Sequence, residues 1–232
     1  MFAGYPAAGL VIGCLLALLF WAAGLVLPDT LAAVALVAGS LLLTGAIHLD
    51  GLADCADAFY GKREKEEALR IFKDPRIGTM GGAAIGISLL ARFAAVSSLG
   101  APVLLLALPV LSAFSRTAVL LALRLLPYAR QAGGIISTDG AQRSGQAGTL
   151  VLAVLVVIGA GVLLPVPTVL AILVLAGFWR LSWKRIGGCT GDVLGASIEI
   201  AEIVFLAALA ATAHIGSAVG LFYALVPLVF PA

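Results

Sequence analysis

Three carboxylates on one short stretch are the first residues of this chain whose spacing could support chemistry. The segment "HLDGLADCAD" carries Asp50, Asp54 and Asp57 at the end of a long apolar run. On an α-helix, positions i, i+4 and i+7 lie within about 60° of one another, so the three side chains would share one face. Like charges this close repel, and a divalent cation that prefers oxygen ligands, Mg²⁺ or Mn²⁺, would offset the repulsion. We therefore expect the three aspartates to be metal ligands and catalytic residues for phosphate chemistry; the alternative is a solvated acidic face balanced by the basic residues that follow.

A second polar segment, "KDPRIGTMGG", follows a short charged helix. Asp74 could complete the metal shell as a fourth ligand and catalytic residue. Lys73 and Arg76 could bind the phosphate oxygens of a substrate, and the glycines would let the backbone approach a ligand closely. The alternative is a turn that ends a surface helix and carries charges for solubility.

Two further polar residues are candidates for substrate binding. Asp192 follows "GGCTG" at the start of a late apolar run, where it could join the metal or substrate site. His48 would project away from the aspartate face of an ideal helix. A direct role for His48 therefore needs a break at Gly51, and local hydrogen bonding is the alternative.

The elements that must position these residues are membrane helices. The chain is 62% apolar and only 11% charged, whereas a soluble domain carries roughly a quarter charged residues. Its mean hydropathy is +1.15. We expect an all-α, polytopic membrane helical bundle of about six to eight transmembrane helices, forming one integral-membrane catalytic domain over residues 1–232. The apolar segments are 5–27, 31–48, 78–99, 102–126, 149–164, 167–182, 193–213 and 215–231.

The basic residues indicate which ends of these segments face the cytoplasm. Every Lys and Arg except Arg92 and Arg116 falls in alternate connecting segments, and the segments between them carry none. The positive-inside rule makes the basic segments cytoplasmic. The acidic and basic segment 48–77 is therefore expected in the cytoplasm, and an even number of spans would place both termini there.

Four ionisable residues lie inside the apolar runs, where an unpaired charge is costly. They are Arg92, Arg116, Glu199 and Glu202. Three interpretations stay open at this point: an intramembrane ion pair, contact of Arg116 with a substrate phosphate, or a path for a transported ion or solute.

Several motifs together resemble one family. "GAIHLDGLADCADAF" followed by "EALRIFKDPRIGTMGG" is similar to the cobalamin synthases, the adenosylcobinamide-GDP ribazoletransferases. "LSAFSRTAV", "YARQAGG" and "GGCTGDVLGASIEIAE" support the resemblance, which runs in order along nearly the whole chain.

The resemblance implies a Mg²⁺-dependent enzyme of the prokaryotic inner membrane with a cytoplasmic active site. It implies that adenosylcobinamide-GDP is joined to α-ribazole, or its 5′-phosphate, with release of GMP. The implied partners are these small molecules and the lipid bilayer, with no nucleic acid, and a homo-oligomer stays open. In this scheme Asp57 or Asp74 accepts the proton of the ribose 5′-hydroxyl. The alternatives are a phospholipid-type alcohol phosphotransferase and a transporter.

Overall fold

The chain folds entirely into helices wherever the structure describes it. The computed structural model describes residues 4–129 and 147–229, with side chains for residues 4–129 and 151–216. These ranges contain no β-strand. The helices are α1 (Tyr5–Gly24), α2 (Asp29–Thr44), α3 (Ile47–Phe59), α4 (Lys65–Ile71), α5 (Thr79–Ser98), α6 (Ala101–Leu125), α8 (Ala147–Leu163), α9 (Pro165–Ile186) and α10 (Gly191–Val229).

Most of these helices are long and apolar enough to cross a membrane. Within the described residues α1, α5, α6, α9 and α10 meet that condition. Helices α2 and α3 meet it only together, and they are bent by 88° where they join. These helices confirm the predicted helical membrane bundle. Their number in the described ranges is five, one below the expected six to eight, or six if the bent pair counts as one span.

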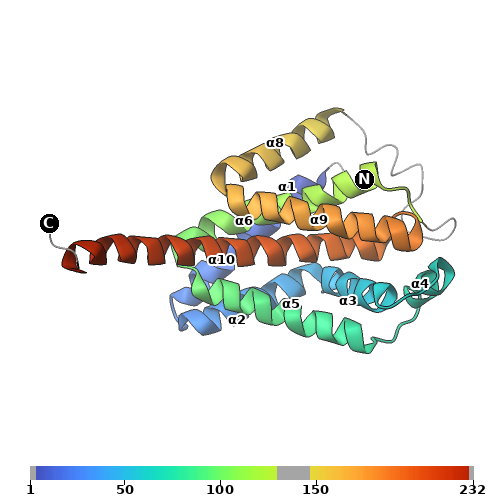
Figure 1. The fold of residues 1–232 in the computed structure, drawn as a ribbon, viewed down its shortest axis with the longest axis horizontal. Coiled ribbons are helices and arrows are strands. Elements are labelled where there is room, and N and C mark those ends of the chain that lie inside the picture. Colours follow the sequence, from blue (N-terminus) through green and yellow to red (C-terminus); the bar gives the residue numbers. More distant parts are fainter. Residues whose placement is uncertain (1–3, 130–146, 230–232) are drawn as a thin grey trace.

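Helix α10 differs from the sequence prediction. We expected two spans, 193–213 and 215–231, with a break near His214, but α10 continues without interruption from Gly191 to Val229. The residues around His214 include no proline, and the single glycine among them, Gly216, does not end the helix. The expectation that both termini share one side depended on that break. The start of α1 and the end of α10 instead lie at opposite ends of the bundle (Figure 1).

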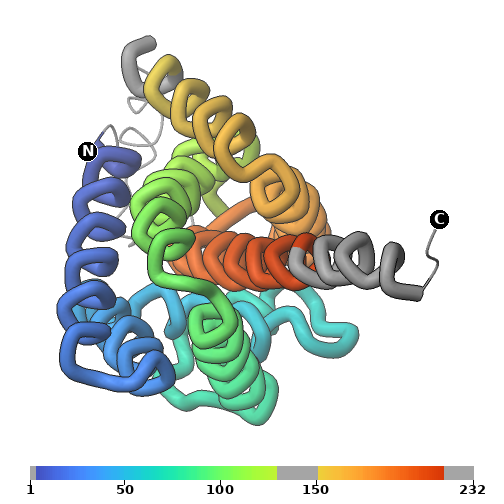
Figure 2. The backbone as a smooth tube through the Cα atoms, turned by 90° about the vertical axis from the view of Figure 1, so that its left-hand side faces the viewer, coloured from blue at the N-terminus to red at the C-terminus, as the bar shows by residue number. Residues whose placement is uncertain are grey.

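Close helix packing depends on small residues at the contacts. A Cβ atom at Gly13 of α1 would lie 2.5 Å from the carbonyl oxygen of Leu108 in α6, and a Cβ at Gly9 would collide with the backbone of Ser112. Glycines four residues apart therefore let α1 and α6 touch backbone to backbone, as is common between membrane helices. Helix α10 is central and packs on α3, α5, α6 and α9 (Figure 2).

One end of the bundle gathers the polar segments. Helix α4, the C-terminal half of α3, the first turns of α5 and α10 and the last turns of α6 and α9 lie together there (Figure 1). Phe59 of α3 holds this end together, because its ring contacts Phe72 after α4 and Phe178 of α9 at centroid distances of 5.7 and 6.3 Å. The described basic segments, 62–76, 124 and 180–185, are thus at one end of the molecule, whereas Arg130 and Arg143 lie outside the described residues.

Candidate active site

A sharp turn before α3 and a close contact with α10 set the orientation of α3. Gly45 and Ala46, with φ angles of 62° and 56°, adopt left-handed conformations and turn the chain between α2 and α3. A Cβ atom at Gly51 would lie 2.6 Å from the carbonyl oxygen of Asp192. Only glycine therefore allows α3 to lie this close to the first turn of α10. A direct role for His48 would have required a break at Gly51, but α3 is continuous there and Gly51 is the point of contact with α10.

The contact with α10 leaves the aspartate face of α3 turned away from the core. Asp50 is exposed and Asp54 is half-buried, whereas Gly51 and Cys55 on the neighbouring face are buried. Asp54 and Asp192 both lie near enough to Cys55 to interact with it electrostatically. Asp192 is thus brought to the aspartate segment, as the sequence predicted.

The residues before α10 hold Asp192 in place. Cys189 pairs with the chain that follows α6: its N–H donates to the carbonyl oxygen of Pro127 at 2.9 Å, and its carbonyl oxygen accepts from the N–H of Ala129 at 2.8 Å. The Thr190 hydroxyl donates to Oδ2 of Asp192 at 3.1 Å. Burial raises the pKa of the Cys189 thiol to about 11, so this cysteine is neutral and structural.

Asp57 has a different environment from Asp50 and Asp54. Its Oδ2 accepts a hydrogen bond from the N–H of Gly78 at 2.7 Å, and its Oδ1 accepts one from the N–H of Gly81 at 2.9 Å. Both donors belong to the start of α5. The carboxylate is therefore engaged by backbone, although each oxygen retains a second lone pair.

Asp74 and Arg76 form a closed pair on the linker between α4 and α5. Oδ1 of Asp74 accepts from Nε of Arg76 at 2.9 Å and from its backbone N–H at 3.1 Å, and Oδ2 accepts from Nη2 at 2.7 Å. These hydrogen bonds lower the pKa of Asp74 to about 2. The Arg76 side chain remains 85% exposed, and Lys73 beside it is exposed as well.

The predicted set of metal ligands is therefore divided among three environments. The described residues contain no group of three or more His, Cys, Asp or Glu side chains arranged to hold a metal ion. Asp50 and Asp54, one helical turn apart at the charged end, still fit the way Mg²⁺ binds in enzymes, through one or two carboxylates together with substrate phosphates and water. Asp57 and Asp74 already bind hydrogen-bond donors of the protein.

The intramembrane charges pair with one another. Nη1 of Arg92 lies 2.9 Å from Oε1 of Glu199, and its Nη2 lies 3.3 Å from Oε2 of Glu202. Arg116 binds Oε1 of Glu202. All four side chains are less than a tenth exposed, and their charges sum to zero. The intramembrane ion pair, one of the three interpretations left open, is thus what the structure contains.

Three serines that were not predicted as site residues complete this buried network. Ser88 donates to Oε1 of Glu199 at 2.6 Å, Ser115 donates to Oε1 of Glu202 at 3.2 Å, and Ser40 accepts from Nη2 of Arg92 at 2.8 Å. Small, weakly polar residues inside apolar helices at the level of a charge are the signal that could have identified them.

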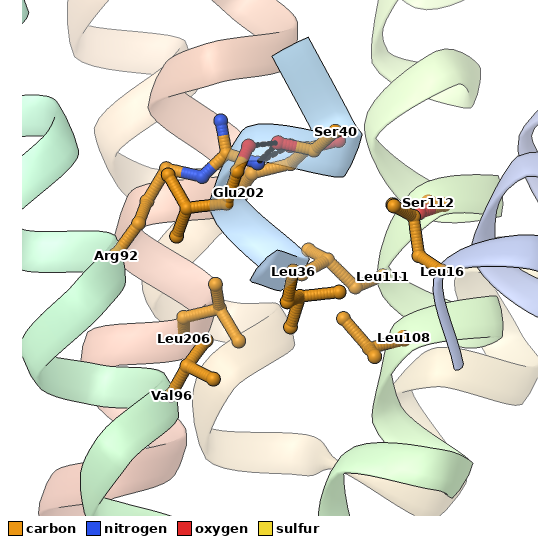
Figure 3. Close-up of a pocket in the computed structure, with 11 residues that line it drawn as sticks. Leu16, Leu36, Ser40, Arg92, Val96, Leu108, Leu111, Ser112, Glu202 and Leu206 are labelled. Carbon is orange, nitrogen blue, oxygen red and sulfur yellow. Dashed lines mark hydrogen bonds and ion pairs between the residues drawn. The ribbon is translucent and has the colours of Figure 1, made fainter. Parts of the chain in front are cut away.

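The network borders two small cavities. One has a volume of about 20 Å³ and lies between Arg92, Glu202 and aliphatic side chains such as Leu108 (Figure 3). The other, of about 10 Å³, is lined by His48 and Arg116 among others. Each has room for about one water molecule. His48 and Arg116, predicted to bind substrate, thus lie beside the ion pairs, and Arg116 could reach a substrate phosphate only if its pair with Glu202 opened.

Comparison with known proteins assigns the chain to a family. Residues 1–210 match the family model described as cobalamin-5-phosphate synthase. The adenosylcobinamide-GDP ribazoletransferase of Azorhizobium caulinodans is 42% identical over 211 residues, covering 87% of this chain and 80% of the relative. Proteins of the same name from Chlorobaculum parvum (41% over 226 residues; 88% and 84% covered) and Escherichia coli (38% over 220 residues; 88% and 85% covered) are similarly related. No solved structure matches the chain. The chain, a helical membrane protein with an aspartate-rich charged end, belongs to the cobalamin-5-phosphate synthase family.

Proposed function

We propose that this protein is an adenosylcobinamide-GDP ribazoletransferase, which joins adenosylcobinamide-GDP to α-ribazole or α-ribazole 5′-phosphate and releases GMP. The observation that carries the proposal is the family match over residues 1–210, with relatives of that name at 38% to 42% identity over most of both chains. The aspartate segment lies inside the matched region. We place the active site at the charged end of the bundle, facing the cytoplasm from the inner membrane of a prokaryote, because basic residues favour that side.

Asp50 and Asp54 are the residues that would hold Mg²⁺, or Mn²⁺ in its place. They are one turn apart on α3, and neither is fully buried. When bound, the cation would supply positive charge to the pyrophosphate of the nucleotide substrate and to the departing GMP. Asp192, which approaches the same part of α3, would orient the acceptor or the metal-bound substrate.

The linker before α5 would supply further positive charge to the phosphate oxygens. Arg76 is oriented by Asp74 through two side-chain hydrogen bonds, and most of its surface remains available to a ligand. Lys73 lies three residues earlier and is exposed. With a pKa of about 2, Asp74 would be a weak proton acceptor at neutral pH, so we assign it to positioning Arg76 rather than to accepting the proton of the ribose 5′-hydroxyl.

The test is GMP release by the purified protein in liposomes, supplied with adenosylcobinamide-GDP, Mg²⁺ and an acceptor, which is α-ribazole in one series and α-ribazole 5′-phosphate in the other. We expect release to require all three, and Asp54→Ala to slow it by about a hundredfold or more, since loss of a metal ligand removes several kcal/mol of transition-state stabilisation. Glu66→Gln, a matched loss of one exposed acid on α4, should leave the rate near that of wild type. No release with either acceptor, or a normal rate in Asp54→Ala, would overturn the proposal.

The described contacts do not favour the transporter alternative. The charges that could have formed a path are paired with one another, and the cavities beside them have volumes of only about 20 and 10 Å³. A phospholipid-type alcohol phosphotransferase would use another activated nucleotide, and the same assay with such donors separates the two enzymes.

A further inference from the structure

Helix α5 begins without a capping side chain of its own. Its N-cap is Gly78, which offers no side-chain oxygen, and no side-chain capping hydrogen bond is formed from that position. The first N–H groups of a helix have no partner within it and carry a partial positive charge. The start of α5 therefore needs an acceptor from elsewhere in the chain.

Asp57 of α3 supplies that acceptor. The N–H of Gly81 is the third of the helix, which an N-cap serine or aspartate would normally bind. Here it donates to Oδ1 of Asp57 at 2.9 Å, while Oδ2 accepts from Gly78 at 2.7 Å. Asp57 is separated from these donors by 21 and 24 residues.

The two glycines make room for this contact. A Cβ atom at either Gly78 or Gly81 would collide with the Asp57 carboxylate. Gly78 has an extended backbone with φ −84° and ψ 179°, which other residues adopt readily. The reason for glycine at position 78 is therefore the space that the carboxylate occupies, and not the backbone conformation.

We propose that Asp57 is a positioning residue that docks the start of α5 onto α3, and that it is not a metal ligand. This assignment deepens the proposed function and rests on it. Arg76 lies two residues before Gly78 and Asp50 lies two turns before Asp57. Docking the start of α5 thus fixes the distance between the linker that would bind phosphate oxygens and the carboxylates that would hold the metal.

The substitution Gly78→Ser should have opposite effects on the start of α5 in the wild-type and Asp57→Ala backgrounds. In the wild-type background Gly78→Ser should weaken docking, because the new side chain meets the Asp57 carboxylate. In the Asp57→Ala background the same serine should restore the cap, since its hydroxyl oxygen can accept from the N–H of Gly81, but not the contact with α3. Only part of the order at the start of α5 should therefore return. Asp57→Asn, which retains one acceptor oxygen, should be intermediate and serves if Asp57→Ala does not fold.

Docking is measured independently of activity by limited trypsin cleavage after Lys73 and Arg76. Cleavage in Asp57→Ala should be about tenfold to a hundredfold faster than in wild type, as expected for losing two hydrogen bonds to a charged acceptor, and slower again in Asp57→Ala/Gly78→Ser. Equal cleavage in wild type and Asp57→Ala would overturn the proposal. The cleavage experiment gives a result even if the wild-type protein releases no GMP. Absence of GMP release would reject the proposed function but not the docking role of Asp57.

The transferase assay separates a positioning residue from a metal ligand. We expect Asp57→Ala to lower the maximal rate of GMP release without changing the Mg²⁺ concentration that gives half of the maximal rate. Adding Gly78→Ser to Asp57→Ala should recover part of the lost rate. Asp54→Ala/Gly78→Ser is the matched control and should gain nothing. A Mg²⁺ requirement raised tenfold or more in Asp57→Ala, with no recovery by the second substitution, would assign Asp57 to the metal instead.

Discussion

The buried ion pairs predict that the same Glu→Gln substitution lowers the free energy of unfolding by different amounts at Glu202 and Glu199. Glu202 is shared between Arg92 and Arg116, whereas Glu199 serves Arg92 alone. Among the described residues, Glu202→Gln therefore leaves Arg116 buried with no carboxylate in an ion pair, while the hydroxyl of Ser115 still accepts from its Nη1. Glu199→Gln leaves Arg92 still paired with Glu202.

The magnitudes follow from the burial of these groups. Removing one partner of a buried pair costs about 3–5 kcal/mol, because an uncompensated charge remains in a region of low polarity. We expect that cost for Glu202→Gln, since Arg116 is only 5% exposed. For Glu199→Gln we expect about 1–3 kcal/mol, the cost of weakened hydrogen bonds to Arg92 and Ser88.

The measurement is the free energy of unfolding in mixed micelles titrated with SDS, read by circular dichroism. The matched control is Arg116→Gln/Glu202→Gln, which removes one charge of each sign and leaves Arg92 with Glu199. It should be more stable than Glu202→Gln alone. The reasoning is refuted if Glu202→Gln costs less than Glu199→Gln, or if the double substitution costs as much as the sum of its two single substitutions.

Three further outcomes follow from the described contacts. Gly51→Ala should destabilise the protein by about 1–3 kcal/mol, because the new methyl group meets the first turn of α10. Gly82→Ala, in open space on α5, should not destabilise it. Unfolding of both variants by SDS titration measures the difference, and equal effects would contradict the close contact at Gly51. The raised pKa of Cys189, about 11, predicts that its thiol reacts with a maleimide at pH 8 far more slowly in native than in SDS-denatured protein. Mass spectrometry of the peptide that contains Cys189 measures the two rates, and equal rates would contradict its burial. Because the pKa of Asp74 is lowered to about 2, its pair with Arg76 contributes fully to stability above about pH 4 and is lost as the pH falls through about 2. Arg76→Gln should return the pKa of Asp74 toward its ordinary value near 4 in a ¹³C NMR titration. An unchanged pKa would refute the pairing.

The aspartate segment shows where prediction from sequence succeeds. Helical spacing placed Asp50, Asp54 and Asp57 on one face, and the structure confirms a helix from Ile47 to Phe59. The spacing could not distinguish the three residues. That distinction depends on α5, which arrives at Asp57 from more than twenty residues away and leaves Asp50 and Asp54 without that contact.

Helix α10 shows where prediction from sequence failed. A hydropathy pattern measures how apolar a stretch is, and "AATAHIGSAV" is polar enough to be taken for a connection. Whether the backbone turns there depends on residues that break a helix; proline is absent from this stretch, and Gly216 alone does not interrupt α10. The long helix also places its own end and the start of α1 at opposite ends of the bundle (Figure 1), which residue composition could not reveal.

The sequence by itself determined that this is a helical membrane protein, that its basic segments gather at one end and that its aspartates lie there, because hydropathy, charge and helical periodicity are local properties. Its motifs also indicated the family. Only the tertiary structure decided which charge meets which partner: Arg92 with both glutamates, Arg116 with Glu202, and Asp57 with the start of α5. Those pairings join helices far apart in the chain, and the close approach of backbones at a few glycines sets their distances.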